Sequence, residues 1–141
     1  MHKIRFDRLV RSGLVAGIVE VALGLLVNGV ILWKLWSNDM IYLSRTEFLN
    51  TEWFEFSILW LILGFFSIWI YVALRSLLGA GWKTAVYAGL TVWVIGVLLP
   101  NTSFMTVMGL FSKHLTLYTT VGGLVQVVAG TVAGAWLYKD K

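Results

Sequence analysis

The sequence predicts an all-α membrane protein, a four-helix antiparallel bundle with both termini in the cytoplasm. Four apolar stretches fill most of its 141 residues, and each is about twenty residues long, enough for a helix to cross the ~30 Å hydrocarbon core of a bilayer. Charged residues make up 13% of the chain, against ~25% in a typical soluble domain. We therefore expect one transmembrane domain over residues 1–141, with four spans: Gly13–Trp33, Phe54–Leu74, Lys83–Leu99 and Leu117–Tyr138.

The basic residues predict the orientation of these spans. Eight of the eleven Lys and Arg lie in the N-terminal tail, in the loop between the second and third spans, and at the C-terminus. Loops that face the cytoplasm carry an excess of Lys and Arg, so these three segments are expected inside. The other three basic residues fall on the opposite, outer side, and these are Lys34, Arg45 and Lys113.

The first outer loop, residues 34–53, is the only connection with room for structure of its own. Its residues Ser44, Arg45, Thr46 and Glu47 have the spacing of a capping box, which is typical of a helix start. One interpretation is a short helix lying at the membrane interface. The other is a loop followed by an early start of the second span, and both stay open at this stage.

The remaining connections are short. Residues 75–81 join the second and third spans, which are therefore expected to be antiparallel neighbours. The third span is expected to end at Pro100, because proline cannot continue the helical hydrogen-bond ladder. The apolar segment Phe104–Phe111 is then too short to cross the membrane and is expected to be a re-entrant or interfacial piece.

Small and polar residues recur at helical spacing in the first and fourth spans. Lipid provides no hydrophobic drive between helices, so membrane helices associate through small residues and shared hydrogen bonds. We therefore expect the first and fourth spans to pack against each other through these stripes, although one stripe facing a partner chain is the alternative. The glycines are Gly13, Gly17 and Gly24 in the first span, with Gly123, Gly130 and Gly134 in the fourth.

Glu20 is an ionisable residue inside the first span, about 10 Å beyond Gly13 along the helix. Such residues are candidates for function, because a charge inside the bilayer is costly. Glu20 is either a proton- or cation-binding group or a residue that only joins helices or turns towards Arg11 or Arg75. From their depth in the bundle, the expected partners of Glu20 are Ser67 and Tyr87, while Asn28 is expected level with Gln126.

Few residues suit cofactors, metals or catalysis. His114 lies in the outer loop at the start of the fourth span, where a histidine can ligate a porphyrin-type cofactor. An ordinary interfacial histidine is the favoured interpretation, and no cofactor is predicted. The sequence has no cysteine and no histidine–carboxylate spacing suited to a metal. No catalytic residues are therefore expected.

The chain resembles small four-span bacterial membrane proteins of uncharacterised function. The resemblance rests on Gly13–Gly17, Asn28-Gly29, the turn Gly79–Ala85, Ala88–Leu90 with Trp93, and the segment Gly134–Tyr138. It covers nearly the whole chain. The resemblance implies the four-span fold and a bacterial inner membrane, and it implies no activity.

These observations favour a non-enzymatic accessory or scaffold subunit. Such a protein associates laterally in the membrane lipid with further copies of itself or with a larger membrane complex, and nucleic acid is not an expected partner. One alternative is a small proton- or cation-coupled transporter or channel subunit that uses Glu20. A second alternative is a cofactor-carrying subunit of a respiratory or photosynthetic complex, with His114 as the ligand.

Overall fold

The computed structural model describes residues 5–44 and 51–138, and within these ranges the chain is helical with no strands. The first and third long helices contain π-helical segments, in which each backbone hydrogen bond joins residues five apart and the turn is wider than in an α-helix. The first helix begins as α1 and continues as η1, and after a bend at Leu32 it leads into α2. The elements in order are α1 (Phe6–Gly24), η1 (Leu25–Ile31), α2 (Trp33–Tyr42), α3 (Thr51–Leu78), α4 (Trp82–Trp93), η2 (Val94–Leu98), η3 (Asn101–Val107) and α5 (Lys113–Leu137).

Four of these helical stretches are long and apolar enough to cross a membrane. The structure therefore confirms the all-helical fold and the four apolar helices expected from the sequence. Each stretch is longer than predicted, because the helices continue through the polar and aromatic residues at their ends. The four ranges are Phe6–Ile31, Glu52–Leu78, Trp82–Val107 and Lys113–Leu137.

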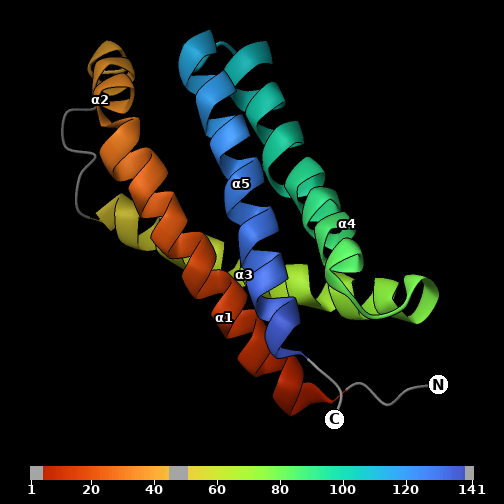
Figure 1. The fold of residues 1–141 in the computed structure, drawn as a ribbon. Coiled ribbons are helices and arrows are strands. Elements are labelled where there is room, and N and C mark those ends of the chain that lie inside the picture. The colour runs from red at the N-terminus through yellow and green to blue at the C-terminus, as the bar shows by residue number, and fades with distance from the viewer. Residues whose placement is uncertain (1–4, 45–50, 139–141) are drawn as a thin grey trace.

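In Figure 1, α5 lies between α1 and α4, and α3 passes behind these helices and crosses them at a large angle. The contacts agree with this view, because α1 packs against α3 and α5, while α4 packs against α5 and α3. The start of α1 and the end of α5 lie at the same end of the molecule (Figure 1). Each long helix is thus held by at least two others.

The expectation that Pro100 ends the third span is wrong. The residues on both sides of Pro100 are helical, and the helix continues to Val107. A proline ring normally clashes with the carbonyl four residues earlier and leaves one hydrogen bond unmade. Here the helix is π-helical before and after the proline, in η2 and η3, and the wider turn makes room for the ring. Phe104–Val107 therefore belong to this helix instead of forming a separate piece.

The segment between the first two spans contains a helix at its start. This helix, α2, lies directly beyond the bend at Leu32. Residues 45–50 lie outside the described ranges, and so does most of the capping box that begins at Ser44. The second long helix begins at Thr51, three residues before the predicted Phe54.

A tight turn joins α3 to α4. Gly79 has a φ angle of 82°, a left-handed conformation that favours glycine. The Thr84 hydroxyl donates a hydrogen bond to the Gly79 carbonyl at 2.8 Å, which fastens the turn to the first residues of α4. Because the turn is short, α3 and α4 follow one another along the chain and also lie next to each other, with the two helices in contact.

Candidate functional site

Glu20 lies in a small polar cluster where α1, α3 and α5 meet. Its side chain is completely buried. Its carboxyl Oε1 accepts a hydrogen bond from the Ser67 hydroxyl of α3 at 3.3 Å. The backbone carbonyl of Glu20 accepts a second bond, at 2.9 Å, from the side-chain Nε2 of Gln126 on α5. The cluster thus links three helices through the interior of the bundle.

Three buried side-chain atoms on α1 and α5 have no hydrogen-bond partner among the described residues. They are Glu20 Oε2, Gln126 Oε1 and Ser12 Oγ. Leaving a buried polar group unsatisfied typically costs ~1–3 kcal/mol. The interface is therefore more polar than helix packing alone requires, and Glu20 is its one ionisable member.

The sequence-based placement of the polar residues was right for Ser67 and wrong for Tyr87. Tyr87 lies on an outer face of α4 with 57% of its surface exposed, so it does not pair with the buried Glu20. Arg75, the suggested inner partner, donates a hydrogen bond to the Tyr138 carbonyl at 3.2 Å. Depth matching along straight helices could not foresee which face of α4 turns inward.

Asn28 does not lie beside Gln126. It belongs to η1, where its side-chain Nδ2 donates to the Gly24 carbonyl at 3.1 Å. Its Oδ1 accepts a hydrogen bond from the Trp36 indole at 3.2 Å. A methyl group on Gly24 would overlap the Gln126 amide, so Gln126 lies against the α1 turn that precedes Asn28.

The glycines of the two stripes do not all face the same helix. In the contact between α1 and α5, a methyl group on Gly130 would lie 2.8 Å from the Ala16 carbonyl oxygen, and one on Gly134 would lie 2.9 Å from the Ala16 Cβ. This contact confirms the predicted pairing of the first and fourth spans. Other glycines of the stripes face different helices. Gly13 and Gly17 lie against Phe65 and Leu61 of α3, and Gly123 lies against Val97.

Those glycines face other helices because α3 crosses the bundle. In Figure 1, α3 passes behind α1, and its residues Phe65 and Leu61 lie against Gly13 and Gly17 in the middle part of α1. The α1 stripe is therefore shared between α3 and α5. We find these stripe glycines inside the bundle, which leaves little of either stripe for a partner chain.

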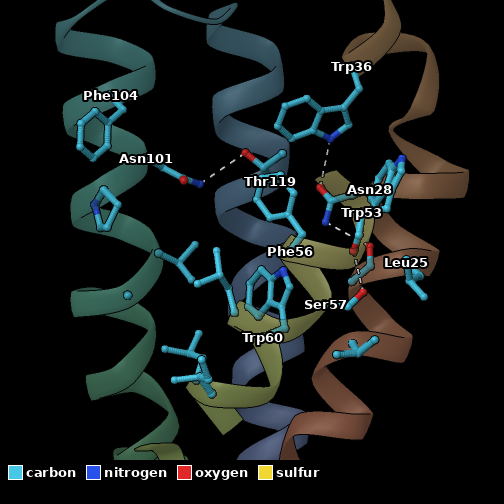
Figure 2. Close-up of a pocket in the computed structure, with 18 of the residues that line it drawn as sticks. Leu25, Asn28, Trp36, Trp53, Phe56, Ser57, Trp60, Asn101, Phe104 and Thr119 are labelled. Carbon is cyan, nitrogen blue, oxygen red and sulfur yellow. Dashed lines mark hydrogen bonds between the residues drawn. The ribbon is translucent and has the colours of Figure 1, made fainter. Parts of the chain in front are cut away.

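The second candidate region is a cavity of about 640 Å³, which we call the interhelical cavity. It is bordered mainly by the first, second and third spans, with further lining residues from α2 and with Thr119 of α5. Its walls are predominantly apolar and aromatic, and Figure 2 shows Trp53, Phe56, Trp60 and Phe104 around it. Several of its lining side chains are also exposed at the molecular surface, so the cavity opens between the helices. These exposed lining residues are Leu25, Phe56, Leu59, Ile62, Phe66 and Phe104.

Polar side chains form a ring in one part of the interhelical cavity. Figure 2 shows Asn28, Trp36, Asn101 and Thr119 on three sides of the space above Trp60. The Asn101 Nδ2 donates to the Thr120 hydroxyl at 3.0 Å and to the Thr119 hydroxyl at 3.4 Å. We call these four residues the polar ring. None of the described residues that line the cavity is charged.

Sequence reasoning missed most of this cavity. The sequence pattern singles out Asn28 and not Asn101. The cavity is bordered by residues of η1, η2 and η3, and the sequence carries no clear signal for π-helical segments. The one available signal is that Asn28 and Asn101 each interrupt an apolar helix near its end.

Within the described residues, neither His114 nor the other residues of metal-binding types form a metal or cofactor site. His114 is exposed at the start of α5 and does not line the cavity. Within the described ranges, no group of three or more His, Cys, Asp or Glu residues lies close enough together to hold a metal ion. No known protein family matches the chain, and comparison with curated proteins and with solved structures gives no match. Four helices long and apolar enough to cross a membrane are typical of multi-pass membrane proteins, and this broad class is what the fold indicates.

Proposed function

We propose that the protein is a non-enzymatic accessory or scaffold protein that binds a partner laterally within the bilayer. The interhelical cavity is the observation that carries this proposal. Its volume falls in the range of ~300–1,000 Å³ found for ligand sites, and it combines apolar walls with a few polar groups as such sites do. Its opening lies along helices that the bilayer would surround, so a partner would reach it from the membrane. The partner is a bilayer molecule, a second copy of the chain or another membrane subunit.

The proposal includes a topology with four antiparallel spans and both termini in the cytoplasm of a bacterium, in its inner membrane. The charges support it. Arg5, Arg8 and Arg11 lie at the start of the first span, while Arg75 and Lys83 flank the turn between α3 and α4. The opposite ends of the spans carry fewer basic residues, and cytoplasmic segments are enriched in them.

The proposed lateral binding is tested by native mass spectrometry of protein extracted gently from its own membrane. Ser57 lines the cavity, whereas its neighbour Ile58 does not line it and is 41% exposed. We expect the wild type to carry a bound partner, Ser57→Phe to lose it because the ring fills the cavity, and Ile58→Phe to retain it. A wild type without bound mass, or equal retention in both variants, would contradict the proposal.

A transporter or channel subunit using Glu20 is the second candidate. It is favoured by one observation, the complete burial of Glu20 within a span together with the unpartnered Oε2. Ionisable residues inside membranes often belong to ion or proton pathways. In proteoliposomes with a pH gradient or a cation gradient, this candidate predicts a flux that Glu20→Gln abolishes while the fold stays intact. If Glu20→Gln changes only thermal stability, Glu20 joins helices and the candidate is rejected.

A further inference from the structure

We propose that the interhelical cavity binds one acyl chain of a membrane lipid, with the ester group of that chain at the polar ring. This inference rests on the proposed function, because it names the partner that the cavity takes from the bilayer. Three properties of the cavity carry it: its size, its depth along the spans, and the chemistry of its lining.

The size of the cavity suits a narrow occupant better than a whole helix of another protein. A membrane-crossing helix about 10 Å wide and 30 Å long fills on the order of 2,400 Å³. The cavity measures about 640 Å³. A volume of this size lies within the ~300–1,000 Å³ of sites for small molecules, and it suits one flexible chain.

The polar ring lies level with the ester region of a bilayer at Asn28 and extends about 5 Å further into the hydrocarbon core at Asn101 and Thr119. The first span has 26 residues, so it is about 39 Å long and extends ~4–5 Å beyond each side of a 30 Å hydrocarbon core. Asn28 lies three residues before the end of this span, about 5 Å along the axis, and is therefore near the core boundary. Asn101 and Thr119 lie six residues from the ends of their spans, about 9 Å along the axis.

The ring residues retain hydrogen-bonding capacity for an uncharged polar group. An amide nitrogen has two N–H donors and an amide oxygen accepts two hydrogen bonds. The Asn28 nitrogen makes one hydrogen bond, to Gly24, within the described part of the chain. The Asn101 nitrogen has no donor left, because it is bound to Thr119 and Thr120. An ester carbonyl, which only accepts hydrogen bonds, therefore suits the remaining amide donor of Asn28.

The rest of the lining suits a hydrocarbon tail. Away from the ring, the cavity is lined by Val21, Leu63, Phe66 and Val97, together with the Trp60 ring. No charged residue of the described chain lines the cavity, so a lipid headgroup has no ionic partner there and stays outside it. The tail therefore lies among the apolar side chains, and the headgroup remains with the other lipids.

The test uses vesicles of phosphatidylethanolamine and phosphatidylglycerol that contain a phosphatidylethanolamine with a photoreactive diazirine on one acyl chain. After irradiation, the adducts are mapped by peptide mass spectrometry. We expect adducts on the cavity residues Trp60, Leu63 and Val97. In Ser57→Phe their yield should fall about tenfold, the change that corresponds to ~1.4 kcal/mol of lost binding free energy, while Ile58→Phe keeps the wild-type yield.

A second cavity-filling variant guards against misfolding of the first. Gly96→Leu fills the cavity from the third span, where an added Cβ would lie 2.9 Å from the flexible end of Leu63. Asn28→Leu removes the remaining amide donor at similar volume, and Val30→Leu, at an exposed neighbour that does not line the cavity, is its control. We expect lower cavity adduct yields in Gly96→Leu and Asn28→Leu only. Equal yields in all folded variants overturn the acyl-chain assignment.

The outcomes separate this inference from the proposed function. If native mass spectrometry shows a bound protein subunit or a molecule without an acyl chain, and Ser57→Phe releases it, the proposed function stands and the acyl-chain assignment is wrong. If wild-type protein carries no bound mass and the adducts are spread over all lipid-facing helices, both fail. An acyl lipid released by both cavity-filling variants supports both.

Discussion

Gly64 determines how closely α1 and α3 approach each other. A Cβ at this position would overlap the backbone nitrogen and Cα of Gly17, so the obstacle is main chain that cannot move aside. Small residues in membrane interfaces allow this kind of backbone contact. Among the described glycine contacts between α1 and α3, an added methyl group therefore has the least room where Gly64 meets Gly17.

We expect Gly64→Ala to lower the free energy of unfolding by about 1–3 kcal/mol, the usual cost of overpacking a close contact. Thermal unfolding in detergent measures the change. Gly29→Ala is the matched control, because an added Cβ there meets its nearest side chain, that of Trp53, at an ordinary 3.9 Å. Equal stability of Gly64→Ala and the wild type would show that the two helices are not held this closely.

Gly64 also shows why single residues were hard to predict. The residues four positions before and after it are Trp60 and Ile68, so no small-residue pattern marks it. Gly13 and Gly17 were recognised from their spacing, but spacing does not say which helix they face. The partner of Glu20 was found on α3, as Ser67, and missed on α4, because depth is readable from sequence and helix rotation is not.

At the scale of elements, α2 is tied to the start of α5. The Asp39 Oδ2 accepts a hydrogen bond from the Ser112 backbone N–H at 2.7 Å, and Ser112 is the N-cap of α5. The Trp36 and Phe111 rings meet edge to face, with their centroids 5.4 Å apart. A carboxylate is favourable at a helix N-terminus, where free N–H groups carry partial positive charge. These contacts hold α2 next to the polar ring.

We expect Asp39→Ala to destabilise this connection by about 1–2 kcal/mol, because it removes a charged acceptor from the α5 start. Hydrogen exchange measures it, and the backbone amides of residues 112–116 should exchange faster. Asn38→Ala changes an exposed neighbour and should leave these amides at the wild-type rate. Unchanged exchange in Asp39→Ala would mean that α2 does not depend on this bond.

The elements themselves were predictable because the bilayer imposes length and apolarity on a spanning helix. All four apolar helices were found in this way, with ends shifted by several residues. The continuation through Pro100 was not predictable, since it depends on π-helical turns on both sides of the proline. The interhelical cavity lies beside these same turns, so the error about Pro100 and the failure to foresee the cavity have one physical origin.

At the scale of the whole molecule, the two candidate regions lie in different parts of the bundle. The Glu20 cluster lies where α1, α3 and α5 meet, and the side chain of Glu20 is fully buried and not exposed at the surface. The interhelical cavity is open and contains neither Glu20 nor Gln126. The two regions adjoin at Gly24, which lines the cavity and lies against the Gln126 amide. The Ser57 hydroxyl instead donates to the Trp53 carbonyl, away from the Glu20 cluster. Ser57→Phe and Glu20→Gln therefore test the lateral-binding and transport hypotheses separately.

The proposed topology makes a prediction that the absence of cysteine in the chain makes easy to test. Single cysteines are introduced at two exposed positions, Asn38 in α2 and Ala80 in the α3–α4 turn. The excess of basic residues near the turn predicts that it faces the cytoplasm. In intact cells, a membrane-impermeant maleimide should label Asn38→Cys and leave Ala80→Cys unlabelled, and permeabilised cells should label both. The reverse pattern would invert the topology and move the polar ring to the cytoplasmic side, where the acyl chain would then enter from the inner leaflet.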